Sequence, residues 1–404
     1  MKIWLFQTSE PLPIKDDNMR LLRTGMMAEA LINRGHEVVW FTGTFNHFKH
    51  EHYYNHDETI KINDKYTINL IHAVGYKKNI SIKRIINHKA IALKLRKKIQ
   101  KLPKPDLIYA SYPSIEFAYE AVKYGKKENI PVIVDIRDLW PDIFSHNLPK
   151  ILKIPAIPFI KYLDKKCKYI CKNACCLNSI SNKMLDWGLK KAGRKKKKND
   201  RYFYIGYKKS VMSLNIKSEF VDKTKFNICF FATINNQFNY EAIVELANNL
   251  KNEDINILIC GVGPKLDYFK SLAKNSNNIK FLGFLDKEKL HYVLTNSDMG
   301  LVPYNNTFDF QMSVSNKYAE YLSYGLPILL TIPGLMKELT DKYKVGYASL
   351  DVKKISSFVC ELKKNSEKYK IYSNNSSNLF TKMFDASKIY IDVVKYIENI
   401  EKEY

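Results

Sequence analysis

Short apolar runs alternate with longer stretches of mixed polarity through the first half of the chain. Apolar runs of a few residues are typical of buried strands, and the stretches between them are long enough for crossover helices. The strands expected from this pattern lie at 3–7, 37–42, 68–73, 106–110 and 132–136, with a helix at 18–33 and a further strand at 201–206. The alternation predicts a parallel sheet, in which ligands gather beyond the carboxyl ends of the strands.

The second half of the chain repeats this alternation. Its expected strands lie at 226–232, 255–260, 279–282, 300–303 and 328–331, with helices at 240–252 and 266–274. A stretch without strong periodicity, 210–223, separates the halves. A final helix at 386–401 carries apolar residues on one face, namely Ile389, Val393, Ile397 and Ile400. The sequence therefore predicts an α/β protein with domains at 1–212 and 213–385 and a C-terminal helix at 386–404.

A short polar-faced helix is expected just before the last of these strands. Ser315 is a suitable N-cap and Gly325 a suitable stop. One face of the helix carries three polar residues that are three and four apart: Asn316, Lys317 and Glu320. A lysine in the first turn opposes the helix dipole, and a bound phosphate would remove that conflict. One turn on, a carboxylate can accept hydrogen bonds from two sugar hydroxyls, so the spacing suits a nucleoside diphosphate. An ordinary exposed helix glutamate is the alternative.

This segment resembles the donor-binding helix of GT-B glycosyltransferases, and of the GT4-like family in particular. In that family a glutamate followed by a Gly-x-Pro turn holds the donor ribose, and Glu320 with the Gly-Leu-Pro turn after it matches. The family often has a second glutamate eight residues earlier, where this sequence has Met312. Asp309 and Gln311 are candidates to replace this glutamate only because they lie close to Met312 in the sequence.

Other candidate donor-binding residues follow predicted strands. Gly261 and Gly263 close one strand and Gly283 follows the next, and glycines there permit close backbone approach to a ligand. The resemblance implies that these loops contact the donor nucleotide. The loop after the first strand lacks the glycines common in the family, and offers Arg20 and Arg23 instead. Arg20 can reach a donor phosphate by its side chain, whereas a solvated helix face is the alternative for both arginines.

A second charged stretch follows the strand at 132–136. Asp135, Arg137, Asp138 and Asp142 come at its carboxyl end, where buried charges are costly unless they are paired or used. The stretch is similar to a D-x-R-D-x-W-P segment of GT4-like enzymes that build bacterial surface polysaccharides, which lines the acceptor side. Asp138 is expected to orient or deprotonate an acceptor hydroxyl and Arg137 to hold a phosphate. A purely structural pair of Asp135 and Arg137 is the alternative.

The formal net charge of +24 favours an anionic partner, although it also reflects a composition rich in lysine throughout. Three stretches are especially basic: 77–101, 148–172 and 190–209. The second also contains many isoleucines and is expected to be broken by Pro155 and Pro158. Basic segments with apolar neighbours suit an anionic membrane surface, whereas each stretch alone also suits a solvated helix face or loop. No nucleic-acid motif appears, so nucleic acid is not an expected partner.

The expected cellular compartment, and the expectation that no cofactor is needed, rest on features that the sequence lacks. It contains no apolar run long enough to span a membrane, and it enters its first strand too early for a signal peptide. The seven cysteines form no disulfide or zinc pattern and are expected to be reduced, buried thiols. No Asp-x-Asp metal motif is present. We expect a cytoplasmic protein, with peripheral contact to the inner face of the cell membrane, that needs no cofactor or metal.

The resemblance implies two Rossmann-like domains facing across a cleft, with the C-terminal helix crossing back to the first. It implies a hexosyltransferase type of enzyme, retaining and metal-independent, that uses a nucleotide sugar as donor. The expected acceptor is a saccharide or a polyprenyl-diphosphate-linked saccharide in bacterial cell-surface polysaccharide synthesis. Two alternatives stay open, a GT-B-like nucleotide-sugar epimerase and a basic nucleic-acid-binding protein.

Overall fold

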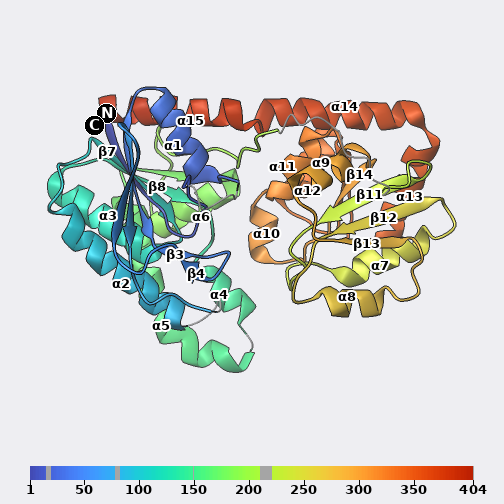
Figure 1. Cartoon of the computed structure of the whole chain (residues 1–404), viewed down its shortest axis with the longest axis horizontal. Helices are drawn as coiled ribbons and strands as arrows, with labels where there is room; N and C mark the ends of the chain where they lie inside the picture. The colour runs from blue at the N-terminus through green and yellow to red at the C-terminus, as the bar shows by residue number, and fades with distance from the viewer. Residues whose placement is uncertain (15–19, 78–81, 149, 210–220, 404) are drawn as a thin grey trace. The chain divides into compact units, whose positions relative to one another are not determined.

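The computed structural model describes residues 1–14, 20–77, 82–148, 150–209 and 221–403, which form two compact units (Figure 1). The first unit contains Met1–Tyr204 and the segment from Ser387 onward, and the second contains Ile205–Ala386. The boundary expected at 212/213 lies outside the described residues. Within these ranges, no helix has both the length and the apolar character that a membrane span requires.

The first unit is built on a sheet with the strand order β10-β9-β8-β7-β1-β2-β6-β5, in which only β5 is antiparallel to its neighbour. Its strands are β1 (Lys2–Phe6), β2 (Glu37–Gly43), β5 (Glu58–Asn63), β6 (Tyr66–Ile71), β7 (Leu107–Tyr112), β8 (Val132–Ile136), β9 (Cys176–Ser179) and β10 (Arg201–Tyr202). A separate small hairpin joins β3 (Phe45–Asn46) and β4 (Glu51–His52). The order of strands reverses direction between β1 and β7, so the carboxyl ends of these two strands mark the switch point of the sheet.

All five strands predicted at 3–136 are present and the strand predicted at 201–206 is present as the shorter β10, whereas β5 and β9 were not predicted. β5 lies at the edge of the sheet, and its residues alternate between exposed and partly buried. β9 reads Cys-Leu-Asn-Ser, which has too little apolar character to stand out, although the sheet buries all of it. Pairing within the sheet therefore stabilises strands whose own hydrophobic pattern does not predict them.

Helices cover both faces of this sheet (Figure 1). They are α1 (Arg23–Asn33), α2 (Ile82–Ile99), α3 (Ile115–Glu128), α4 (Asp142–Asn147), α5 (Lys150–Asn173), α6 (Asn182–Ala192) and α15 (Ala386–Glu403). The helix predicted from residue 18 begins at Arg23, and residues 15–19 lie outside the described ranges. The predicted break at Pro155 and Pro158 is wrong, because α5 runs through both prolines. The carbonyls that lose a helical donor there belong to exposed residues, so water can satisfy them.

The C-terminal helix α15 belongs to the first unit from Ser387 onward. Its apolar face is buried, with Val393, Ile397 and Ile400 each at most 1% exposed. Glu398 adds polar contacts to the segment between α1 and β2, through Arg34 at 3.0 Å and His36 Nε2 at 2.9 Å. His36 therefore has a structural partner.

The second unit contains a fully parallel sheet in the order β13-β12-β11-β14-β15-β16. Its strands are β11 (Phe226–Phe231), β12 (Ile255–Cys260), β13 (Ile279–Gly283), β14 (Met299–Val302), β15 (Ile328–Leu330) and β16 (Gly346–Ala348). Its helices are α7 (Tyr240–Asn249), α8 (Leu266–Leu272), α9 (Lys287–Thr295), α10 (Phe308–Met312), α11 (Asn316–Ser323), α12 (Leu335–Tyr343), α13 (Val352–Lys364) and α14 (Ser366–Met383). The five strands predicted here are all present. The switch point of this sheet lies between β11 and β14.

Candidate functional site

In the second unit, the candidate donor residues lie at the start of α11, which connects β14 to β15 at the carboxyl edge of the sheet. Ser315 caps this helix, because its side chain accepts a hydrogen bond from the backbone N–H of Tyr318 at 3.3 Å. Gly325 follows the helix with a φ of 70°, a left-handed conformation that glycine adopts without strain. The predicted N-cap and stop are both confirmed. Asn316 is exposed at the first helical position.

Lys317 lies inside a cage of three aromatic rings. Its Nζ is 4.9 Å from the ring centre of Phe238, 5.6 Å from that of Tyr304 and 5.7 Å from that of Phe231. Phe231 ends β11 and Tyr304 follows β14, so the ammonium group lies at the switch point of the sheet. Burial lowers the pKa of Lys317 to about 8, although Glu320 acts in the opposite direction. Within the described residues Lys317 forms no ion pair, and the rings hold its charge through their negative faces.

Glu320 is buried, with only 8% of its surface exposed. Its Oε1 accepts a hydrogen bond from the hydroxyl of Tyr207 at 3.1 Å. The interpretation of Glu320 as an ordinary exposed glutamate is therefore wrong. Nearby, the hydroxyl of Tyr324 is 2.7 Å from Nδ1 of His291, and burial raises the pKa of Tyr324 to about 12. A buried carboxylate one helical turn after a caged lysine can accept hydrogen bonds from a vicinal diol.

The two glycines after β12 and the glycine that ends β13 have a structural role of their own. Gly261 and Gly263 have φ values of 142° and 158°, and a Cβ atom on them would meet the carbonyl oxygens of Ala232 and Ile234 at 1.8 and 2.4 Å. These glycines therefore let the loop after β12 pack against the loop after β11. Gly283 has a φ of 67° and accepts a hydrogen bond from the N–H of Gly261 at 2.7 Å. All three lie at the same edge of the sheet as α11.

The position where the family often has a second glutamate lies on the short helix α10. Met312 is its last residue and is half-buried. The Gln311 amide donates a hydrogen bond to Asn306 at 2.7 Å. Phe310 stacks on Tyr304 with 4.1 Å between ring centres, which ties α10 to the rings around Lys317.

In the first unit, the charged stretch after β8 is joined to α1 by a buried ion-pair network. Asp135 is fully buried and accepts from Arg23 Nε at 2.9 Å and from Arg137 Nε at 2.7 Å. Arg137 also pairs with Glu10 and donates to Thr24 Oγ1 at 3.0 Å. Burial acts to raise the pKa of Asp135, but the two guanidinium groups outweigh it and hold this pKa below its usual value.

This network changes the interpretation of both arginines. Arg23 is 3% exposed, so a solvated helix face is wrong for it. It also donates to the backbone oxygens of Phe203 and Tyr204 at 3.0 and 3.3 Å, which fixes the end of the first unit's main segment. Arg137 serves the structural pairing that we named as its alternative, and its Nη2 has no hydrogen-bond partner among the described residues. Arg20 is exposed, in the segment before α1.

Asp138 is half-buried in the turn after β8, and its Oδ1 accepts a hydrogen bond from the N–H of Leu139 at 2.7 Å. Arg84 on α2 interacts electrostatically with Asp138. Burial lowers the pKa of Arg84, whereas the negative charge of Asp138 acts to raise it. Asp142, in contrast, is used structurally, since it accepts from Trp187 Nε1 at 2.8 Å and Lys191 Nζ at 2.6 Å.

Several residues of these sites were not singled out from the sequence. They are Phe231, Phe238 and Tyr304 around Lys317, Tyr207 against Glu320, and Arg84 near Asp138. Phe231 and Tyr304 could have been found, because each stands at the carboxyl end of a strand that was predicted. Tyr207, Phe238 and Arg84 carry no such local signal.

Comparison with known families and structures agrees with this architecture. Residues 23–198 match the family model described as Glycosyltransferase Family 4, and residues 212–379 match Glycosyl transferases group 1. No curated protein sequence matches the chain significantly.

Three solved structures resemble this chain over nearly its whole length. Sucrose-phosphate synthase from Thermosynechococcus elongatus has a TM-score of 0.77 at 12% identity, covering 100% of both chains. HepE from Anabaena in complex with UDP-glucose has a TM-score of 0.63 at 12% identity, covering 99% of this chain and 100% of that one. WaaG, a glycosyltransferase involved in lipopolysaccharide biosynthesis, has a TM-score of 0.65 at 10% identity, covering 98% of each. With both halves matched to glycosyltransferase families and the fold shared with these enzymes, the chain belongs to the GT4-like glycosyltransferases of the GT-B fold.

Proposed function

We propose that this glycosyltransferase moves a hexose from a nucleoside-diphosphate sugar to a lipid-linked saccharide. The observation that carries the donor half of the proposal is the geometry around Lys317. A caged ammonium group at the switch point, next to the N-terminus of α11, supplies positive charge where a diphosphate leaves. Glu320, one turn on, receives the ribose hydroxyls. HepE from Anabaena was solved with UDP-glucose, which makes UDP the first nucleotide to test.

The acceptor half of the proposal rests on Asp138. It lies beyond the carboxyl end of β8, beside the switch point of the first sheet, and one carboxylate oxygen is held by a backbone N–H. In this proposal the carboxylate of Asp138 accepts the proton of the attacking hydroxyl or orients it.

Three finer properties belong to the same proposal. The reaction retains the anomeric configuration, which proton NMR of the product measures directly. It needs no divalent metal, so an excess of EDTA leaves the rate unchanged. The enzyme acts in bacterial cell-surface polysaccharide synthesis, in the cytoplasm and peripherally on the inner membrane face, which fits the basic and apolar surface of α5. Deletion of its gene would then truncate a surface glycan.

The first experiment is a thermal shift of the wild type and Glu320→Ala with UDP, GDP, ADP and CMP. One nucleoside diphosphate is expected to raise Tm by mass action, and the variant to lose that rise. The matched control is Glu245→Ala, which removes an exposed glutamate from α7 and should respond as the wild type does. Absence of any nucleotide response in the wild type would contradict the donor site.

The epimerase alternative is separated by incubating the nucleotide sugar with the enzyme and no acceptor. A transferase leaves the sugar's stereochemistry intact, whereas an epimerase produces the second isomer in the NMR spectrum. The nucleic-acid alternative requires a binding that weakens steeply with salt. In the lysine-rich loop at 194–200, which lies in the third basic stretch, the single acid Asp200 is buried and pairs with Arg194, so that loop has a structural anchor.

A further inference from the structure

The first unit contains a cavity of about 260 Å³ that the donor and acceptor residues above do not use. It lies between α2, the segment after β8, α4 and α5, and its wall is mainly apolar: Ile115, Trp140, Phe144, Phe159, Ile160 and Leu163 line it. An engineered apolar cavity of about 150 Å³ stays dry and takes up benzene. This cavity is larger and open to solvent on one side, and an apolar group that enters it gains by burial against the apolar wall.

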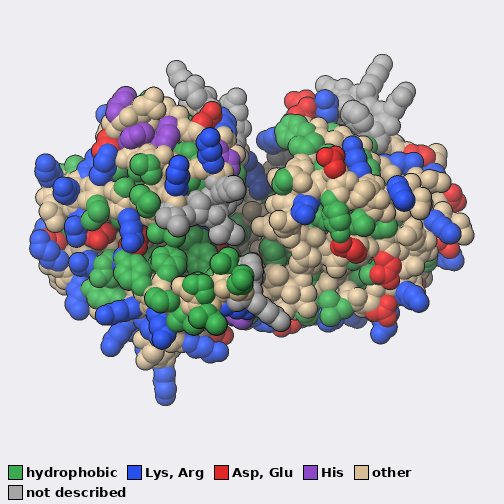
Figure 2. Space-filling view, turned by 90° about the horizontal axis from the view of Figure 1, so that it is seen from below, with side chains coloured by type: hydrophobic (Ala, Val, Ile, Leu, Met, Phe, Trp, Pro, Cys, Tyr) green, Lys and Arg blue, Asp and Glu red, His purple; other side chains and the backbone are tan. Residues whose placement is uncertain are grey.

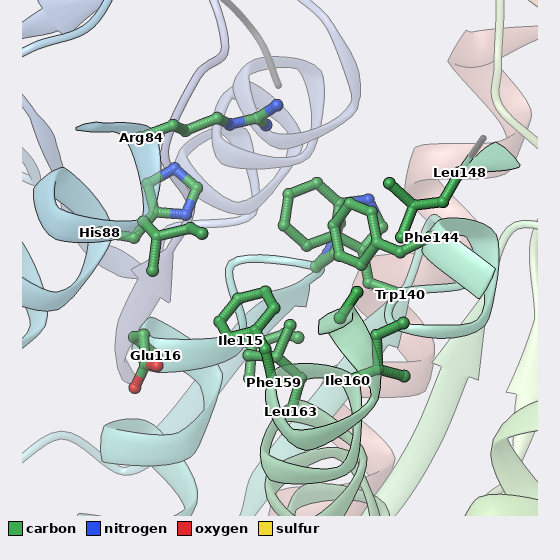
Figure 3. A pocket seen from close by; sticks show the side chains of 13 residues that line it. Arg84, His88, Ile115, Glu116, Trp140, Phe144, Leu148, Phe159, Ile160 and Leu163 are labelled. Atoms are coloured by element: carbon green, nitrogen blue, oxygen red, sulfur yellow. The ribbon is translucent and has the colours of Figure 1, made fainter. Parts of the chain in front are cut away.

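One side of the cavity is polar. Figure 3 shows Arg84, His88 and Glu116 along this side, across from Trp140, Phe144 and Leu148. His88 Nε2 and Glu116 Oε1 are buried, and neither has a hydrogen-bond partner among the described residues. Burial lowers the pKa of His88 to about 3, so this imidazole is neutral at physiological pH. The neutral ring of His88 can donate a hydrogen bond to an anionic ligand, whereas the Glu116 carboxylate only accepts hydrogen bonds and is paired through Oε2 with Lys166.

The polar side also leads towards the candidate base. The guanidinium of Arg84 is 5.0 Å from the ring centre of Trp140, which stands two residues after Asp138. The negative charge of Asp138 also acts to raise the pKa of Arg84, so the two side chains interact electrostatically. A ligand whose chain fills the apolar part and whose anionic group meets Arg84 would end close to Asp138.

The surface around the cavity is apolar and basic at once. On α5, Ile151 and Ile154 are 84% and 77% exposed, with the exposed lysines Lys153, Lys161 and Lys165 on the same helix. Figure 2 shows a hydrophobic area on the first unit bordered by lysine and arginine side chains. This pattern matches an amphiphile with a hydrocarbon chain and an anionic head, whereas a neutral apolar molecule would not need the basic border.

We propose that the cavity binds the hydrocarbon chain of an isoprenoid diphosphate, the lipid part of the acceptor, with Arg84 facing its phosphates. The chain occupies the space between Trp140 and Phe159, and the diphosphate leaves the polar side towards Asp138. This inference rests on the proposed function for its role, but binding itself needs neither donor nor catalysis.

The test uses farnesyl diphosphate, a soluble short isoprenoid diphosphate, titrated into the full chain by calorimetry. Ala156 lines the cavity on α5, and Ala156→Phe fills it; the variant is expected to weaken binding by about tenfold or more. Ile157→Phe adds the same ring at the next, exposed position outside the lining and should change affinity by less than about twofold. Inorganic diphosphate, which lacks the chain, should bind at least about a hundredfold more weakly.

Equal affinities of the wild type and Ala156→Phe for farnesyl diphosphate would overturn the proposal. So would equally tight binding of inorganic diphosphate, since that would indicate an anion site without a chain pocket. If Ala156→Phe also weakened binding to phosphatidylglycerol vesicles as strongly, the cavity would hold an ordinary membrane lipid and the proposal would again be wrong.

A photoreactive farnesyl diphosphate makes the test independent of any variant's folding. Its labels should map to the elements that line the cavity, namely α2, the start of α3, the segment after β8, α4 and α5, and labels elsewhere would contradict the site. Because no step uses a nucleotide sugar, failure of the donor thermal shift and failure of this binding are separate results.

Discussion

Single residues of the same charge meet different environments in this protein. Lys317 is enclosed by aromatic rings, whereas Arg23 is buried by ion pairs with Asp135 and by two backbone oxygens. The sequence predicts that both residues lie on helices. It predicts a role in donor binding for Lys317, whereas for Arg23 it leaves open either a role near the donor or a solvated helix face. Their neighbours decide the outcome, because burial destabilises a charge unless a partner compensates for it.

The lowered pKa of Lys317 predicts a pH dependence of donor binding. Its ammonium is charged below a pH of about 8 and neutral above it. Affinity for the nucleoside diphosphate should therefore fall as pH rises through about 8, and by about tenfold once the charge is lost. The bound diphosphate raises this pKa, so the complex loses its proton at a higher pH than the free enzyme. Calorimetric Kd values across this pH range measure the effect.

Lys317→Arg is the matched control, because arginine keeps its charge throughout this range. Its affinity should not fall between neutral and moderately alkaline pH. A wild-type Kd that does not change with pH, or the same decline in Lys317→Arg, would refute the assignment.

At the scale of elements, the two halves of α5 lie in different environments, one buried in the first unit and one exposed to solvent. Leu163, Cys167 and Ile170 are buried against the first unit. The first half of the helix, with its two prolines, exposes apolar side chains among lysines. Such a face suits insertion at the interface of an anionic membrane.

We predict that Ile151→Ser with Ile154→Ser reduces binding to anionic vesicles. The two side chains are three residues apart on one face, and removing both should lower partitioning by about tenfold or more in a sedimentation assay. Leu350→Ser, which changes an exposed leucine of the second unit, should leave partitioning unchanged. Equal partitioning of the double variant and the wild type would exclude α5 as the contact.

At the scale of the whole molecule, the two units carry different parts of the proposed reaction. The second unit supplies Lys317 and Glu320 to the donor, and the first supplies Asp138 and the cavity to the acceptor. The family models divide in the same way, at 23–198 and 212–379. Changes in the two units should therefore have separable effects.

Asp138→Asn tests this separation. The amide cannot take up a proton, so kcat for transfer should fall by about 10²–10⁴-fold, while the nucleotide thermal shift stays at the wild-type value. Asp186→Asn, an exposed carboxylate on α6, is the control and should keep full activity. A variant at Asp138 with normal kcat, or with a lost thermal shift, would contradict the division of roles.

The sequence by itself determined the central strands of both sheets, the repetition of the α/β pattern, the capped helix α11 and the family. These are local signals, because periodicity, caps and the Glu-to-Gly-x-Pro spacing lie within a few consecutive residues. Only the tertiary structure decided that Phe231, Phe238 and Tyr304 surround Lys317, that Arg23 is buried, and that α2, α4 and α5 enclose a cavity. The physical reason is that burial and pKa depend on side chains that are distant in sequence and become neighbours only when the elements pack.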